Sequence, residues 1–182
     1  MANITLAVTG SISAYKAADL TSQLTKLGHK VTVLMSRSAM DFITPLTLQS
    51  LSKNLVHTDI MVEEDPSLIK HIDISKETDL FLVAPASANT IAKLAHGMAD
   101  NIVIATALAL PIGIPKLIAP AMNTNMYLNP ATQKNLNTLE EYGFDEVKPR
   151  EALLACGDFG TGALAEVTDI LEKVSNTLDE KK

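Results

Sequence analysis

The stretch Lys116-Leu-Ile-Ala-Pro-Ala-Met-Asn-Thr-Asn-Met126 decides the fold class that this sequence predicts. The apolar run over residues 115–119 is typical of a parallel strand buried on both faces, and Pro120 ends it because proline has no N–H to donate to a neighbouring strand. Polar side chains therefore follow directly after the carboxyl end of a strand. Ligands bind at that edge of open α/β sheets, so Asn123 and Met126 are candidates for ligand binding. A capped turn between a strand and a helix is an equally good interpretation of the same residues.

Strands and helices alternate along the rest of the chain. Further strands are predicted over residues 4–8, 31–35, 80–84 and 144–147, with a short edge strand near 55–58. Helices are predicted over residues 14–27, 45–51, 73–78, about 90–97, 101–110, 130–142 and 166–178. This alternation predicts a three-layer, doubly wound, mostly parallel sheet of five or six strands, of the Rossmann or flavodoxin type. We expect a single domain over residues 1–182, with a flexible tail near residues 179–182.

Punctuating residues mark the ends of several predicted elements. The predicted helix starts are Thr44-Pro45, Asp100 and Asn129-Pro130, and the predicted stops are Gly28 and Gly143. Residues 60–69 are rich in acids and predict a surface loop that leads to His71. Residues 148–162 are polar and contain several glycines, which predicts a mobile loop that covers a ligand.

The composition argues against several classes of function. The chain of 182 residues is 47% apolar and carries 15 Lys and Arg against 21 Asp and Glu, for a net charge of −6, with no basic cluster. A nucleic-acid surface needs concentrated basic charge, so we expect no nucleic-acid partner. The apolar stretch 102–118 is interrupted by Pro111, Gly113 and Pro115, which predicts a helix and a strand and no membrane span. The amino terminus lacks a signal-peptide pattern and Cys156 is the single cysteine, so we expect a cytoplasmic protein.

Polar loops follow three of the predicted strands. They contain Gly10, Ser11 and Ile12, then Ser36 and Ser38, then Ser87, Ala88, Asn89 and Thr90. In a doubly wound sheet these loops face one crevice, and the N–H groups of Ser11 and Ile12 begin a helix, where phosphate is favoured. The loops together predict a nucleotide or phosphate site, although N-capping explains each serine taken singly. The glycines do not match G-x-G-x-x-G and no acid follows at the ribose-binding distance, so NAD is not expected.

Two residues outside these loops are candidates for proton transfer. His71 follows a loop and precedes a helix that we place on the ligand side, which suits a group that exchanges a proton near neutral pH. Cys156 lies in Leu154-Ala-Cys-Gly-Asp158, where a thiol among glycines favours a chemical role over a structural one. No second histidine or carboxylate stands at metal-ligand spacing from His71, so we expect no metal.

Five motifs, in order, resemble those of the homo-oligomeric flavin-containing cysteine decarboxylases, and the similarity covers about residues 4–166. The family often has tryptophan where this chain has Tyr127. The motifs are Gly10-Ser-Ile-Ser-Ala-Tyr-Lys16, His71-Ile-Asp-Ile-Ser75, Ala84-Pro-Ala-Ser-Ala-Asn-Thr90, Pro120-Ala-Met-Asn-Thr-Asn-Met126 and Ala155-Cys-Gly-Asp158.

This resemblance implies a carboxy-lyase of coenzyme A biosynthesis that uses FMN to decarboxylate 4′-phosphopantothenoylcysteine to 4′-phosphopantetheine. Asn123 would hold the substrate carboxylate, Met126 would shape that pocket, and Lys16 is a candidate for charge at the site or a solvated helix lysine. His71 would be the acid and base of the oxidation and decarboxylation, and Cys156 would donate the proton that completes the product. The residues implied to bind FMN are Gly10, Ser11, Ile12, Ser36, Ser38, Ser87, Ala88, Asn89, Thr90 and Ala121.

The resemblance also bears on assembly and leaves rival functions open. It implies a trimer or a multiple of trimers, in which the helix predicted over residues 101–110 is either an interface or part of the core. The chain ends soon after the decarboxylase region, so we expect a form without a fused synthetase domain. The rivals are a peptidyl-cysteine decarboxylase of lantibiotic maturation, a non-catalytic regulatory subunit of a phosphatase, and a flavin prenyltransferase. Cys156 within Ala-Cys-Gly-Asp favours the coenzyme A enzyme.

Overall fold

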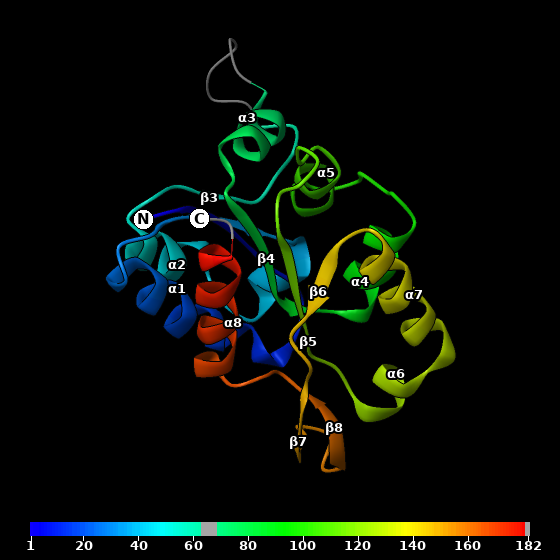
Figure 1. Cartoon of the computed structure of the whole chain (residues 1–182). Helices are drawn as coiled ribbons and strands as arrows, with labels where there is room; N and C mark the ends of the chain where they lie inside the picture. Colours follow the sequence, from blue (N-terminus) through cyan, green and yellow to red (C-terminus); the bar gives the residue numbers. More distant parts are fainter. Residues whose placement is uncertain (63–68, 181–182) are drawn as a thin grey trace.

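A parallel sheet forms the centre of the computed structural model, which describes residues 1–62 and 69–180 (Figure 1). Its six strands lie in the order β3-β2-β1-β4-β5-β6, and all neighbouring pairs are parallel. The order reverses between β1 and β4, and ligands of doubly wound sheets bind at the carboxyl ends of such a pair. The predicted fold class is confirmed. The strands are β1 Asn3–Val8, β2 Lys30–Met35, β3 Val56–His57, β4 Leu80–Ala86, β5 Lys116–Pro120 and β6 Phe144–Glu146.

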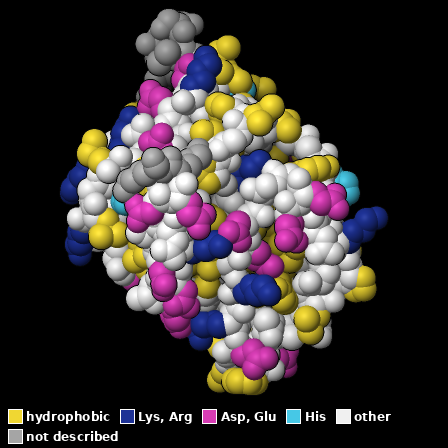
Figure 2. Space-filling model, viewed as in Figure 1, with side chains coloured by type: hydrophobic (Ala, Val, Ile, Leu, Met, Phe, Trp, Pro, Cys, Tyr) yellow, Lys and Arg dark blue, Asp and Glu magenta, His cyan; other side chains and the backbone are white. Residues whose placement is uncertain are grey.

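Helices cover both faces of the sheet, with α1, α2 and α8 on one face and α4, α5 and α7 on the other (Figure 1). On the side that Figure 2 shows, basic and acidic side chains are interspersed. The helices are α1 Lys16–Lys26, α2 Pro45–Ser52, α3 Lys70–Glu77, α4 Ala88–Ala95, α5 Ile102–Leu108, α6 Thr124–Leu128, α7 Pro130–Glu141 and α8 Val167–Asp179, and the short 3₁₀ helices are η1 Ile12–Tyr15 and η2 Arg37–Asp41.

The central strands are apolar on both sides because two separate cores meet at the sheet. In β4, Leu80 and Leu82 belong to the core beneath α1 and α8, whereas Phe81 and Val83 belong to the core beneath α4 and α5. All residues of β4 are buried, which explains its uninterrupted apolar sequence. Burial of each large side chain stabilises the folded state by roughly 1.5–3 kcal/mol. The central strands therefore form a stable base for the polar loops at their carboxyl ends.

Some element ends differ from the prediction. Asn101, and not Asp100, caps α5, since its Oδ1 accepts from the N–H groups of residues 103 and 104 at 3.1 and 3.2 Å. Asp100 instead pairs with Lys93. The strand predicted to end at Ala84 continues to Ala86 through a cis Ala84–Pro85 bond. The short helix α6 was not predicted, and it separates the Asn123 turn from α7.

The largest correction concerns residues 148–162, which were predicted to be a loop without strands. They form most of an antiparallel hairpin, β7 Arg150–Leu153 and β8 Phe159–Ala163, which lies beyond the carboxyl ends of the sheet strands (Figure 1). Within the loop predicted at residues 60–69, residues 63–68 lie outside the described residues. The predicted tail begins later than expected, because α8 extends to Asp179, and its residues 181–182 also lie outside the described part of the chain.

The apolar stretch 102–118 contributes α5 and β5, as predicted. None of the helices in the described ranges combines the length and the apolar character that crossing a membrane requires.

Candidate active site

The three serine-bearing loops converge on the carboxyl end of β1, as predicted. The backbone N–H of Ser36 donates to the carbonyl of Val8 at 3.0 Å. The hydroxyl of Thr9 accepts from the backbone N–H of Ser87 at 2.8 Å and donates to the carbonyl of Pro85 at 2.7 Å. Thr9, which the sequence did not single out, therefore ties the loop after β4 to the end of β1.

Gly10 has a packing role that was not predicted. A Cβ built on Gly10 would lie 2.4 Å from the Ser38 hydroxyl, so the absence of a side chain lets the loop after β2 pack against the loop after β1. The Ser38 and Ser36 hydroxyls are 3.2 Å apart and share a hydrogen bond. Close approach between two protein loops, before any ligand is considered, thus requires glycine at this position.

The serines are helix caps and retain capacity for a ligand. Ser11, Ser36 and Ser87 each accept a hydrogen bond from a backbone N–H of the helix that follows, at 3.2, 3.3 and 3.3 Å. A hydroxyl that accepts such a bond keeps its own hydrogen to donate. The Ser87 hydroxyl donates its hydrogen to Thr90 Oγ1 at 3.1 Å. Ser11 lines a cavity, and its hydroxyl can donate to a ligand there. Capping and ligand binding are therefore compatible at Ser11.

A cavity of about 430 Å³ lies between these loops, the turn after β5 and the hairpin. Among the predicted residues outside its lining are Ser36, Ser38, Asn89 and Thr90. Ser38 packs against Gly10, and Ser36 shares a hydrogen bond with Ser38. Arg150 also lines the cavity, and sequence reasoning missed it because β7 was not recognised as a strand. The predicted residues that do line it are Gly10, Ser11, Ile12, Lys16, Ser87, Ala88, Ala121, Asn123, Met126 and Cys156.

Asn123 and Cys156 meet at the mouth of this cavity. Asn123 is the N-cap of α6, and its Oδ1 accepts from the backbone N–H of Asn125 at 2.8 Å. Its Nδ2 donates to Cys156 Sγ at 3.3 Å and to Asp158 Oδ2 at 3.4 Å. Cys156 Sγ also donates to Asp158 Oδ2 at 3.4 Å. The capped-turn interpretation of the opening stretch is therefore confirmed, the same residue lines the cavity, and Asp158 joins the cluster.

Two glycines of β8 bring the hairpin against the turn that carries Asn123. The backbone N–H of Met122 donates to the carbonyl of Gly162 at 2.9 Å. A Cβ at Gly162 would lie 2.3 Å from the carbonyl oxygen of Met122, and one at Gly160 would lie 2.6 Å from Thr124 Oγ1. These glycines permit close packing, which brings the hairpin that carries Cys156 against the turn that carries Asn123.

Two cations at the cavity share one carboxylate. Lys16 Nζ lies 3.4 Å from Glu166 Oε2, and Arg150 Nε lies 2.9 Å from Glu166 Oε1. Since two positive charges face one negative charge, this wall of the cavity keeps an excess of positive charge that favours an anionic ligand.

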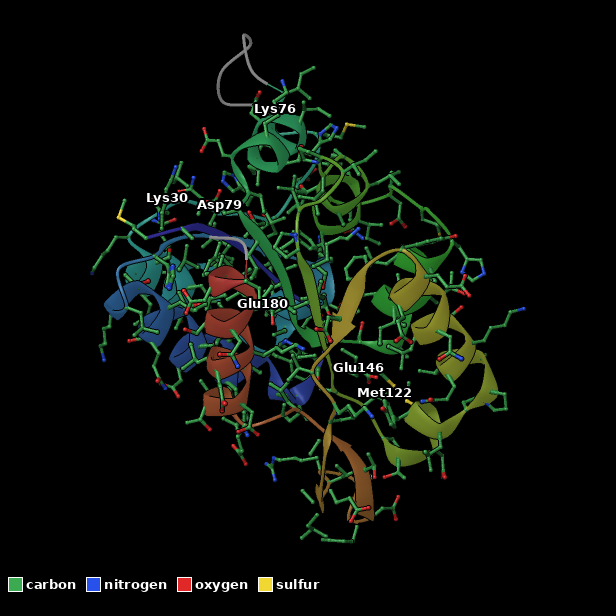
Figure 3. The ribbon with its side chains drawn as sticks, viewed as in Figure 1. Lys30, Lys76, Asp79, Met122, Glu146 and Glu180 are labelled. Carbon is green, nitrogen blue, oxygen red and sulfur yellow. The ribbon has the colours of Figure 1, made fainter. Side chains whose placement is uncertain are left out.

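Tyr127 stands where the resembled family often has tryptophan, and it fixes α6 to the edge of the sheet. Its hydroxyl donates to Glu146 Oε1 at 3.0 Å. Burial, and then the charge of Glu146, raise the pKa of Tyr127 to about 12, and burial also raises the pKa of Glu146. Figure 3 shows Glu146 and Met122 near the hairpin. The Tyr127–Glu146 bond therefore holds the helix that begins at Asn123.

His71 does not lie at this cavity, so its predicted place on the ligand side of its own chain is wrong. It occupies the first turn of α3, and the residues that follow α3 join the start of the sheet, where Thr78 bonds Thr5 at 2.7 Å and the Asp79 N–H donates to the carbonyl of Asn3 at 2.8 Å. Figure 3 labels Lys76 of α3 at the opposite end of the molecule from Met122. In the described part of the chain, His71 Nδ1 is buried and has no hydrogen-bond partner.

No group of three or more His, Cys, Asp and Glu side chains within the described ranges is arranged to hold a metal ion. The polar groups at the carboxyl edge are hydroxyls, amides, two cations, one thiol and the carboxylates of Asp158 and Glu166.

Comparison with known proteins identifies relatives of the whole chain. The model of the family described as Flavoprotein matches residues 1–179. The chain is 59% identical over 175 residues to a probable phosphopantothenoylcysteine decarboxylase of Streptococcus mutans, which covers 96% of this chain and 98% of that protein. It is 46% identical to the coenzyme A biosynthesis bifunctional protein CoaBC of Bacillus subtilis over 93% of this chain, but spans only 41% of that longer relative.

Solved structures agree with these matches. A variant of PPC decarboxylase complexed with pantothenoylaminoethenethiol superimposes with a TM-score of 0.88 at 30% identity, covering 98% of each chain. The FMN-dependent cysteine decarboxylase SpaF superimposes with a TM-score of 0.86 at 27% identity, covering 99% of this chain and 97% of that one. Because the family model and these relatives extend over nearly all of its residues, the chain belongs to the Flavoprotein family.

Proposed function

We propose that this chain is an FMN-dependent decarboxylase that converts 4′-phosphopantothenoylcysteine to 4′-phosphopantetheine in coenzyme A biosynthesis. The observation that carries the proposal is the cluster of Asn123, Cys156 and Asp158 at the mouth of a cavity whose floor is the serine-bearing edge of the sheet. Similarity to the Streptococcus mutans relative, which covers 98% of that protein, supports the substrate.

The residues at the edge fit FMN. The Ser11 hydroxyl has a hydrogen to donate, the N–H groups around Ile12 begin η1 and α1, and the positive wall at Lys16 favours a phosphate. The packed pair Gly10 and Ser38 would hold these groups in place, and Ser87, Ala88 and Ala121 would contribute to the remaining wall. Ser36, Asn89 and Thr90 lie outside the lining and would support the loops that form it. When bound, FMN supplies the oxidation of the substrate thiol that makes decarboxylation possible, and the electrons that are returned afterwards.

The chain's own residues would position the substrate and move its protons. Asn123 Nδ2 points toward the hairpin because its Oδ1 is held by Asn125, so it presents its donors to the substrate carboxylate. Met126, which is 50% exposed, would provide apolar contact beside it. After the carboxyl group leaves as carbon dioxide, Cys156 would transfer its S–H proton to the carbon that lost it, and the thiolate would recover a proton from solvent.

We further propose that the protein acts as a homotrimer, or a multiple of it, in which His71 of one copy reaches the cavity of another. Its buried, unpartnered Nδ1 and its distance from the cavity of its own chain support this arrangement. Ile69, the N-cap residue of α3, is 56% exposed and offers apolar surface for a contact. The predicted helix at residues 101–110 contributes less to an interface, because residues 102–104 of α5 are buried in the core of the chain itself. We expect the assembly in the cytoplasm.

The function is tested by colour and turnover. Purified protein should be yellow, and incubation with phosphopantothenoylcysteine should release carbon dioxide and phosphopantetheine. Cys156→Ser should still release carbon dioxide but accumulate the enethiol, and His71→Asn should abolish release, whereas His96→Asn, at an exposed helix end, should match the wild type. A colourless protein that cannot be reconstituted with FMN would exclude the proposal, and turnover of a cysteine-terminated peptide alone would favour the peptidyl-cysteine decarboxylases.

The shared site is tested by mixing two inactive variants. His71→Asn and Asn123→Asp each disable one half of a site that two copies would build. Exchange of subunits between the two should restore part of the wild-type activity, because some contacts then join an intact His71 to an intact Asn123. Mass measurement should first confirm that the subunits have exchanged. If activity then does not recover, His71 lies outside the site.

A further inference from the structure

The donors proposed for the substrate carboxylate are already engaged within the chain. Asn123 Nδ2 donates to Cys156 Sγ at 3.3 Å and to Asp158 Oδ2 at 3.4 Å, and these two acceptors lie 3.4 Å apart on the same side of the amide. The amide cannot turn over without cost, because Oδ1 accepts the N–H of Asn125 at 2.8 Å and an NH₂ group in that place would face a donor. A carboxylate of the protein therefore already lies at the amide group that a substrate carboxylate would need.

The turn at the tip of the hairpin fixes Asp158 beside the thiol. The Leu154 N–H donates to the carbonyl of Asp158 at 2.8 Å, and the Gly157 N–H donates to the carbonyl of Leu154 at 2.9 Å. Gly157 adopts φ +89°, a conformation that few other residues tolerate. With the turn closed in this way, the Cys156 S–H lies 3.4 Å from Asp158 Oδ2, and its hydrogen is directed at Asp158.

We propose that Asp158 is a positioning residue that takes the place of the substrate carboxylate on Asn123 and holds the Cys156 thiol until that carboxylate has left. This inference rests on the proposed function and deepens it. Two carboxylates within contact distance of one amide repel each other, so a ligand that carries a carboxylate displaces the Asp158 side chain and breaks its hydrogen bond with the Cys156 thiol. Carbon dioxide is neutral and does not compete, so Asp158 returns after decarboxylation.

This exchange sets the order of the two steps. While the carboxylate occupies Asn123, Asp158 and the thiol beside it are kept away from the amide, and protonation of the substrate by Cys156 is delayed. When the carboxyl group has gone, the hydrogen bonds among Asn123, Asp158 and Cys156 re-form and bring the S–H group to the mouth of the cavity. The proton is therefore delivered only to the decarboxylated molecule.

The charge of Asp158 is tested first on the protein without substrate. Cys156 is the single cysteine, so the mass of the intact protein reports its alkylation. Iodoacetate carries a carboxylate and iodoacetamide does not, and the ratio of their rates measures repulsion at the thiol. Asp158→Asn should raise that ratio about fivefold, as expected for loss of one charge at contact distance in water. Glu151→Gln, which removes an equal charge on the same hairpin where Glu151 contacts Thr161, should change it less than about twofold.

Turnover supplies the second readout. Asp158→Asn should lower the KM for phosphopantothenoylcysteine about fivefold, leave the inhibition constant of phosphopantetheine unchanged because it lacks the carboxylate, and slow formation of the saturated product about tenfold. Asp158→Ala should give the same alkylation ratio, which separates charge from local packing.

An unchanged ratio in both Asp158 variants, an equal change in Glu151→Gln, or a parallel shift of KM and the inhibition constant would overturn the role of Asp158. A wild-type protein with no turnover would instead overturn the proposed function, since the alkylation ratio requires no activity.

Discussion

Replacing Gly162 with alanine should detach the hairpin from the active site without unfolding the chain. The glycine adopts φ +149°, and the added Cβ would stand 2.3 Å from the carbonyl oxygen of Met122. The backbone strain alone costs about 1–3 kcal/mol. The overlap needs a shift of roughly 1 Å, which breaks the 2.9 Å hydrogen bond between Met122 and Gly162 and costs about another 1 kcal/mol.

This loss of about 2–4 kcal/mol acts on a weakly held element, because a two-stranded hairpin is marginal without the surface it packs on. Opening of residues 150–163 should therefore become at least about 30-fold more frequent, since each 1.4 kcal/mol is a factor of about 10. Hydrogen exchange followed by mass spectrometry measures this: amides of β7 and β8 should exchange faster, while those of β1 and β4 should stay protected.

The matched control is Gly113→Ala. Gly113 also has a positive φ of +89°, but no atom lies within 4 Å of its added Cβ, so it carries the strain without the overlap and lies far from the hairpin in the sequence. Its hairpin exchange should equal that of the wild type. Unchanged protection of β7 and β8 in Gly162→Ala would refute the conclusion that glycine at this position serves close packing.

Two further predictions concern residues around the turn after β5. Asn123→Asp should retain FMN, seen by its visible absorbance, but raise the KM for phosphopantothenoylcysteine at least about tenfold, because a carboxylate would face both the substrate and Asp158; normal turnover would place the carboxylate anchor elsewhere. Burial raises the pKa of Glu146 from 4.5, so the folded state binds the proton of Glu146 more tightly than the unfolded state does. Proton binding therefore stabilises the folded state. This contribution is complete below pH 4.5 and is lost as the pH rises through the raised pKa. Glu146→Gln should therefore gain stability relative to the wild type between pH 4.5 and 7 in urea unfolding, and a constant difference would contradict it.

The sheet and its polar edge could be predicted from sequence because their signals are local. A strand such as Leu80–Ala86 is buried on both faces, so its residues are apolar without interruption, and few other structures produce that pattern. The polar loops then had to meet, since parallel strands in a doubly wound sheet end at the same edge. Asn123 and Cys156 were found by the same reasoning together with the family motif, but their contact depends on the hairpin.

The hairpin itself could not be predicted, because glycine has two uses that a sequence does not separate. It permits flexibility, and it also permits backbone to approach backbone, and which of the two applies depends on the neighbour. At Gly160 and Gly162 the neighbours are Thr124 and Met122, which lie some forty residues earlier in the chain. Arg150 and Asp158 were missed for the same reason, since the hairpin brings Arg150 to the cavity and Asp158 to Cys156 and Asn123.

The place of His71 shows the limit of a topological rule. Helices of doubly wound sheets usually begin near the carboxyl edge, so a residue at a helix start is expected beside the ligand. The eight residues of α3 span only about 12 Å, whereas the seven residues of β4 span about 23 Å. Because α3 ends where β4 begins, its first turn cannot reach the other end of that strand. In the proposed trimer, His71 would therefore reach the cavity of a second copy of the chain, and association and catalysis would depend on the same residue.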